Sequence, residues 1–126
     1  MDNELKTKWV AALRSGEFQQ GQQMLHIADD NKHSYCCLGV LCKVMGAEYI
    51  EWFNPDDPED EGWLNRPVLD GKNLADDEEL NTTALNMIGI TKSEQDHLVR
   101  MNDGHTDPYM KKHTFEEIAE HIEKNL

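Results

Sequence analysis

Apolar residues near the N-terminus recur at the spacing of one helix face. The members of this face are Leu5, Trp9, Ala12 and Leu13. Asp2 can cap the first turn of such a helix, and Ser15-Gly16 can end it, because glycine readily takes a left-handed conformation. The pattern therefore predicts a helix that Asp2 caps and that runs through Arg14, with Trp9 as a core residue.

The C-terminal third carries two capping boxes. In this motif a Thr side chain caps a helix, and a Glu three residues later bonds back to the Thr backbone. Thr91 with Glu94 predicts a helix over about residues 92–102, and Thr114 with Glu117 predicts a second, final helix. The apolar stripe of the final helix consists of Phe115, Ile118, Ala119 and Ile122.

The centre of the chain holds its longest nearly unbroken apolar run and all three cysteines. The run covers residues 35–45 and is too long for one strand. It therefore predicts a buried helix over about residues 36–45, which Gly46 closes. Short segments at 22–27 and 33–36 flank a polar turn and predict a β-hairpin that leads directly into this helix.

The region between the central helix and the C-terminal third carries weaker signals. Asp70-Gly71 predicts a turn, and the acidic cluster at 76–79 favours the N-terminus of a helix near residues 78–87. The 126 residues predict a single domain, residues 1–126, of the α+β class;. We expect it to be mainly helical, with four or five helices and a small β-hairpin before the central cysteine-containing helix.

The composition bears on the compartment. No apolar stretch approaches the ~18 residues of a membrane span, and the acidic start of the chain is unlike a signal peptide. Three cysteines, two of them adjacent, make a poor disulfide framework;. We therefore expect a cytoplasmic protein with free thiols and no membrane association.

The thiols could pack in the core, act as nucleophiles or bind a metal. Cys36 or Cys37 would lie at the N-terminus of the central helix, where the helix dipole stabilises a thiolate. A nucleophile also needs a base, and the spacing selects none of the six histidines;. Zinc needs four convergent ligands, whereas the cysteines form one cluster beside His33. The apolar neighbours favour inert packing, so we expect no metal and no cofactor, and a binding protein rather than an enzyme.

The net charge of −13 bears on the choice of partner. Such a protein repels phosphate, which argues against direct nucleic-acid binding, and it suits a partner protein with a basic surface. Residues 54–62 hold two prolines and five acids and predict an exposed loop;. Aromatic side chains beside charge are typical of interfaces. The candidate partner-binding residues are Trp52, Phe53, Asp56, Asp57, Glu59, Asp60, Glu61 and Trp63.

Three segments together resemble a group of small proteins encoded by tailed bacteriophages and prophages. The most specific is the Tyr-Cys-Cys-Leu-Gly-Val-Leu-Cys string at residues 35–42. It is preceded by residues 9–16 with Gln20-Gly21, and followed by residues 101–103 and 114–119. The resemblance implies a phage protein that acts in the bacterial cytosol, and it implies no particular reaction.

Two functional hypotheses follow. The first is an acidic phage accessory protein that binds and modulates a host cytosolic component, such as a defence factor. The alternative is a small-ligand protein, either a sponge for a signalling nucleotide or a cysteine-dependent enzyme. The residues that could line a pocket for that alternative are Arg14, Gln20, Gln22, Tyr35 and Cys36.

Overall fold

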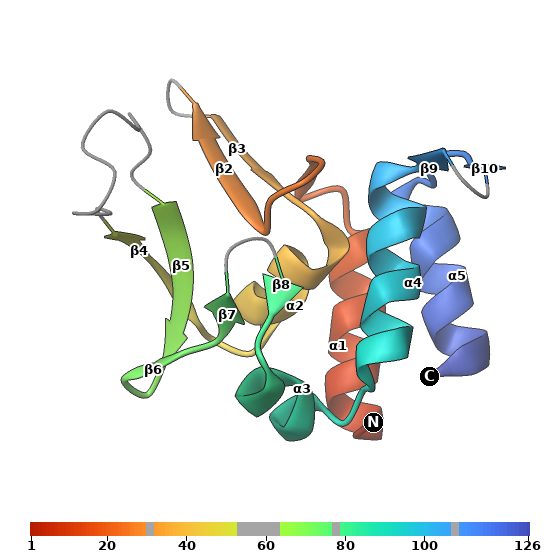
Figure 1. Ribbon diagram of the computed structural model, residues 1–126. Helices are drawn as coiled ribbons and strands as arrows, with labels where there is room; N and C mark the ends of the chain where they lie inside the picture. Colours follow the sequence, from red (N-terminus) through yellow and green to blue (C-terminus); the bar gives the residue numbers. More distant parts are fainter. Residues whose placement is uncertain (30–31, 53–63, 77–78, 107–108) are drawn as a thin grey trace.

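The computed structural model describes residues 1–29, 32–52, 64–76, 79–106 and 109–126. Its fold is α+β, as the sequence predicts, and five helices dominate the described part of the chain (Figure 1). The helices are α1 (Asn3–Arg14), α2 (Cys37–Val44), α3 (Thr82–Ile88), α4 (Lys92–Asp103) and α5 (Phe115–Asn125). None of the helices in these ranges is both long and apolar enough to cross a membrane.

The predicted helix caps are confirmed by the hydrogen bonds that form them. The Asp2 side chain accepts a hydrogen bond from the Leu5 backbone N–H at 3.0 Å and begins α1. Both capping boxes form, at Thr91 before α4 and at Thr114 before α5. The central helix also forms within the predicted range, and Gly46 follows it in a left-handed conformation.

The strands form short sheets. They are β1 (Gln19–Gln20), β2 (His26–Asp29), β3 (Lys32–Tyr35), β4 (Glu48–Trp52), β5 (Leu64–Leu69), β6 (Lys72–Asn73), β7 (Ala75–Asp76), β8 (Glu79–Leu80), β9 (His105–Thr106) and β10 (Tyr109–Met110). The predicted hairpin is β2–β3, with bounds shifted by a few residues, and β1 adds to β3 in parallel. A second sheet has the order β4-β5-β6, so β4 lies at its edge.

The predicted start of the helix near residues 78–87 is wrong. Asn81, and not the acidic cluster, caps this helix, because its side chain accepts from the Ala84 backbone N–H. The residues before it are held in the two-stranded pair β7–β8. The Asp70-Gly71 turn is confirmed, with φ of 51° and 77°, and it joins β5 to β6.

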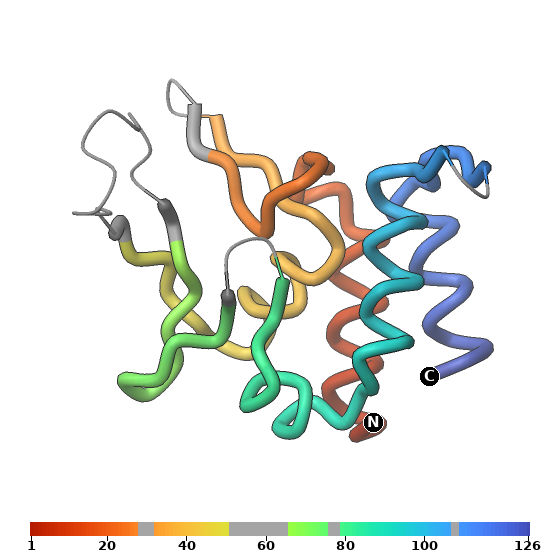
Figure 2. The backbone as a smooth tube through the Cα atoms, in the orientation of Figure 1, coloured from red at the N-terminus to blue at the C-terminus, as the bar shows by residue number. Residues whose placement is uncertain are grey.

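Helix α2 lies at the centre of the molecule (Figure 1). Helices α1, α4 and α5 cover one side of it and the sheet β4-β5-β6 lies on the other, while β8 reaches α4, where the Leu80 N–H donates to the Gln95 side chain at 2.8 Å. Trp9 is fully buried, and its indole N–H donates to the Cys37 carbonyl at 2.9 Å, which confirms it as a core residue. Figure 2 traces α1 and α5, the first and last helices, side by side.

Candidate functional site

Three segments that are far apart in the sequence, around residues 9–21, 35–42 and 101–119, meet at the N-terminal end of α2. Their meeting point is Asn102, a fully buried polar residue near the end of α4. Its side-chain oxygen accepts from the Cys37 backbone N–H at 3.2 Å and from the Gln20 side chain at 3.1 Å. Its amide donates to the Gly21 carbonyl at 2.8 Å. One side chain therefore joins segments that are far apart in the sequence.

Asp103 extends this network to the loop that covers it. Its carboxylate accepts from the Asn102 amide at 2.8 Å and from the Gln23 backbone N–H at 3.0 Å. Gln23 has a φ of 73°, a left-handed conformation that is uncommon for residues other than glycine;. The bond to Asp103 stabilises this loop conformation.

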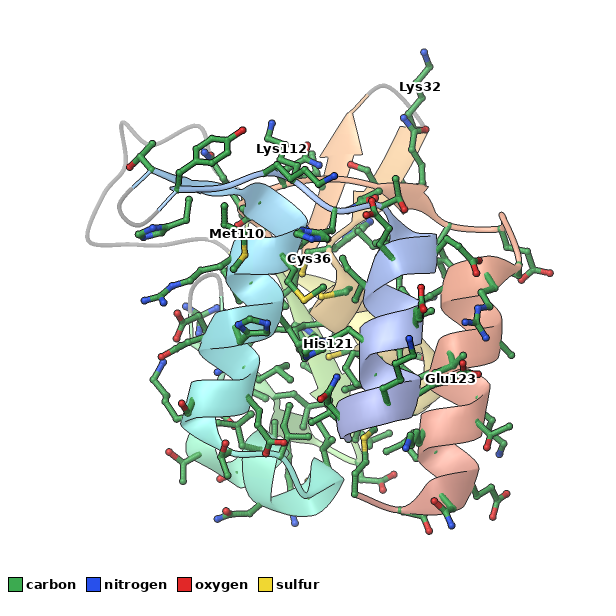
Figure 3. The ribbon with its side chains drawn as sticks, turned by 90° about the vertical axis from the view of Figure 1, so that its right-hand side faces the viewer. Lys32, Cys36, Met110, Lys112, His121 and Glu123 are labelled. Carbon is green, nitrogen blue, oxygen red and sulfur yellow. The ribbon has the colours of Figure 1, made fainter. Side chains whose placement is uncertain are left out.

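A small cavity of about 40 Å³ lies beside the network. Its lining residues are Gln23, Cys36, Cys37, Glu79, Val99, Asn102 and Asp103. In Figure 3, Cys36 is seen inside the molecule, between the ribbons of α4 and α5. This volume accommodates one or a few water molecules, whereas ligand pockets for drug-sized molecules occupy about 300–1,000 Å³. The site therefore has the dimensions of a hydrated structural network.

All three thiols are buried. Burial raises the pKa of the Cys36 thiol to about 12, and the backbone N–H groups of Gly39 and Leu38 oppose this effect only in part. Burial likewise raises the pKa of Cys42 to about 12 and the pKa of Cys37 well above its usual value. Because the thiolate is the reactive form, thiols held in this state are poor nucleophiles at neutral pH.

This burial predicts slow thiol chemistry in the native protein. A soluble thiol reagent should label Cys36, Cys37 and Cys42 slowly at neutral pH and rapidly after denaturation. Replacing Cys37 or Cys42 with alanine should cost about 1–3 kcal/mol of the free energy of unfolding, through the cavity that it leaves. Rapid labelling of one cysteine in the folded protein would contradict this account.

The residues proposed for a ligand pocket do not all come together. Gln20 and Cys36 both lie around Asn102. Arg14 is elsewhere, on the surface between α1 and α5, where it pairs with Glu123 at 2.7 Å and Glu116 at 3.1 Å. The guanidinium is thus already engaged by two carboxylates.

The other two members of that set are separate from the cavity lining. The Tyr35 ring packs against the rings of Phe18 and His26. Gln22 is half-buried in the loop before β2 and does not line the cavity. The set therefore divides among four environments.

The predicted partner-binding residues fall in a part of the chain that the structure does not describe. Phe53, Asp56, Asp57, Glu59, Asp60, Glu61 and Trp63 lie outside the described residues, and of Trp52 only the backbone in β4 is described. The structure describes the two paired strands on either side, β4 before this segment and β5 after it.

The negative charge is concentrated in one part of the sequence. Residues 48–79, which we call the acidic sheet region, contain twelve of the 25 Asp and Glu residues but only two of the 12 Lys and Arg residues. Their net charge is −10, out of −13 for the whole chain. Strands β4, β5 and β6 of this region lie across α2 from helices α1, α4 and α5 (Figure 1), whereas Glu79 at the start of β8 pairs with Lys92 of α4 at 2.6 Å. Most of the net negative charge therefore lies in this one region of the chain.

Two features of the site escape analysis of the sequence. Asn102 is recognisable there only as part of a helix end. The paired rings of His26 and His33, with nitrogens 2.8 Å apart, depend on hairpin register and carry no local signal. Among the described residues, no group of three or more His, Cys, Asp or Glu side chains is arranged to hold a metal ion.

Comparison with known proteins gives one match. Residues 1–126 match a protein family described as a domain of unknown function (DUF8296). Searches of curated proteins and of solved structures returned no match. The match covers the whole chain, so the protein belongs to the DUF8296 family.

Proposed function

We propose that the protein is a phage-encoded accessory protein that binds and modulates a component of the bacterial cytosol, for example by inhibiting a defence factor. The observation that carries this proposal is the concentration of charge, with −10 of the net −13 in residues 48–79. The phage origin and the cytosolic setting rest on the resemblance of the segments around residues 9–21, 35–42 and 101–119.

The chemistry of the interior supports binding in preference to catalysis. The thiols are buried with raised pKa values, and the cavity beside them holds about 40 Å³. The polar groups around Asn102 are engaged with one another and with the backbone. These features stabilise the fold and leave the surface as the place where the protein acts.

The acidic sheet region suits a partner with a basic surface. Complementary charge accelerates encounter and suppresses association with acidic partners. In the described part of this region, edge strand β4 exposes Glu48 and Ile50, an acidic and an apolar side chain together. The aromatic residues Trp52, Phe53 and Trp63 are the anchors that we expect beside the acidic loop.

Affinity capture from bacterial lysate, repeated after nuclease treatment and small-molecule extraction, tests the proposal. We expect a basic host protein that is retained after both treatments, and whose association slows as salt increases. Expression in bacteria that carry a defence system should also raise the plating efficiency of a sensitive phage. Loss of the captured protein with nuclease, or after small-molecule extraction, would contradict the proposed direct contact.

Neutralising the acidic residues between positions 56 and 61 should leave the fold intact. Replacing Asp56, Asp57, Glu59, Asp60 and Glu61 with Asn or Gln removes five like charges from six successive positions, and this segment contains no Lys or Arg. Their mutual repulsion is screened over about 8 Å at physiological ionic strength, so its removal should change stability little or raise it slightly. Chemical denaturation measures this, and a marked loss of stability would show that these carboxylates have structural partners.

A further inference from the structure

His26 and His33 form a pair on the β2–β3 hairpin that the proposed function does not use. They lie diagonally across the β2–β3 hairpin, where His26 is opposite Tyr35 and His33 is opposite Ala28. His26 Nε2 and His33 Nδ1 are 2.8 Å apart, and the two rings are nearly coplanar, at 5°. This is the geometry of a direct hydrogen bond between the two imidazoles.

The surroundings of His26 are closed and apolar. The residue is only 6% exposed, and its ring lies against the rings of Tyr35 and Tyr49, with centroids at 4.8 Å and 4.6 Å. The Tyr49 hydroxyl donates to the Gly39 carbonyl of α2 at 2.8 Å. The histidine pair therefore belongs to the contact that joins the β2–β3 hairpin to β4 and α2.

The charged groups near His26 oppose its protonation. Besides His33 and the two tyrosines, α2 contributes Lys43, and the only charged residue of β5, which contacts β2, is Arg66. Strand β4 carries two glutamates, Glu48, which is exposed, and Glu51. Among the described groups, those whose charge shifts the pKa of His26 are His33 and Lys43, and neither is a carboxylate. Burial first, then His33 and Lys43, lower the pKa of His26 to about 4.

The possible proton positions on the two imidazoles also disfavour protonation of the pair. His26 Nδ1 is buried without a hydrogen-bond partner among the described residues. If His26 donates from Nε2, His33 accepts through Nδ1, and a proton added to His33 Nδ1 breaks that bond. If the bond is kept by reversing the tautomers, His26 Nδ1 carries a buried N–H with no acceptor, which is costly. Each added proton therefore weakens the contact.

We propose that His26 and His33 form an acid-sensitive contact that holds the β2–β3 hairpin against β4 and α2, and that acidification releases the hairpin while the helices stay packed. The direction of the pH dependence follows from the different proton affinities of the folded and the open state. Because the folded state disfavours the proton relative to the open state, this contribution to stability is complete above about pH 6.5 and is lost as the pH falls towards 4;.

Amide hydrogen exchange of the full chain between pH 7 and pH 5 tests the proposal. After correction for intrinsic rates, the opening equilibrium of the hairpin amides of Ile27 and Ser34 should rise about 20-fold between pH 7 and pH 5. Amides in α4 and α5 should change much less. His26→Phe, which keeps an aromatic ring but cannot be protonated, should abolish the dependence, and His97→Gln on the exposed face of α4 should retain it.

Equal hairpin protection at the two pH values would overturn the proposal, as would the same pH dependence in His26→Phe. If His26→Phe does not fold, a pH titration of the His26 ring resonances in NMR spectra of the unmodified protein tests the proposal. A His26 titration midpoint below pH 5 supports the proposal, and a midpoint near the ordinary value of about 6.5 overturns it.

Discussion

Replacing Gly39 with alanine should prevent the protein from folding stably. A Cβ atom at this position of α2 would overlap the backbone oxygen of Leu25 and lie 2.7 Å from its carbonyl carbon. Leu25 is buried, and its oxygen accepts from the Cys36 N–H at 3.3 Å, so the backbone has little freedom to move away. Alanine is favoured over glycine in helices by about 1 kcal/mol, but a clash between backbone segments outweighs that gain.

We expect Gly39→Ala to cost more than about 4 kcal/mol of the free energy of unfolding, a loss at the extreme of single substitutions. Lys43→Ala is a matched control, because Lys43 is exposed on the same helix, and its effect should stay within about 0.5 kcal/mol. Chemical denaturation of the two variants beside the unmodified protein makes the comparison. Stability of Gly39→Ala equal to that of the unmodified protein would show that α2 does not approach the chain at Leu25 so closely.

Replacing Asn102 with leucine should be the second most damaging change. The substitution retains most of the volume but removes every hydrogen bond that the Asn102 side chain makes at the meeting point of the three segments. The Cys37 N–H, the Gly21 carbonyl and the Gln20 amide would each lose a partner in a buried place. Since each buried group left without a partner costs about 1–3 kcal/mol, we expect a total loss of about 3–5 kcal/mol.

The control for this change is Asn86→Leu, which makes the same chemical replacement at an exposed position of α3. Its stability should be close to that of the unmodified protein. Thermal and chemical denaturation should agree in ranking the two variants. An Asn102→Leu variant as stable as Asn86→Leu would mean that the network contributes little to the fold.

The helices were predictable because their signals are local. A cap at Asp2 and capping boxes at Thr91 and Thr114 act over three or four residues, and the structure forms each of them where the sequence predicts it. The α+β class followed from the same signals together with the β2–β3 hairpin. The start of α3 was misplaced because acidic residues favour any helix N-terminus, whereas the Asn81 side chain makes the actual cap.

The remaining strands and the site depend on contacts between distant residues. Tyr49 pairs with Pro67 across the segment between β4 and β5, and the two-residue strands β6 to β8 are too short to show a period. Asn102 bonds to Gln20 and to Cys37, which lie 82 and 65 positions away. No local pattern encodes such pairings.

From the concentration of charge we propose that the protein meets its partner through the acidic sheet region. Two variants with the same net charge distinguish an effect of where the charges lie from an effect of the total charge. One neutralises Asp56, Asp57, Glu59, Asp60 and Glu61, and the other neutralises Glu4, Glu17, Asp96, Glu116 and Glu120, which lie outside residues 48–79. Each change takes the chain from −13 to −8. The ion pairs lost in the second variant are at the surface and contribute little to stability.

The most direct measurement is the association rate of the two variants and the unmodified protein with the captured host protein at low salt. We expect the variant neutralised between residues 56 and 61 to associate at least about tenfold more slowly, because charge placed at an interface steers encounter. The variant neutralised outside residues 48–79 should associate at a rate close to that of the unmodified protein. Equal rates for both variants, whether reduced or unchanged, would contradict the claim that the acidic sheet region is the contact surface.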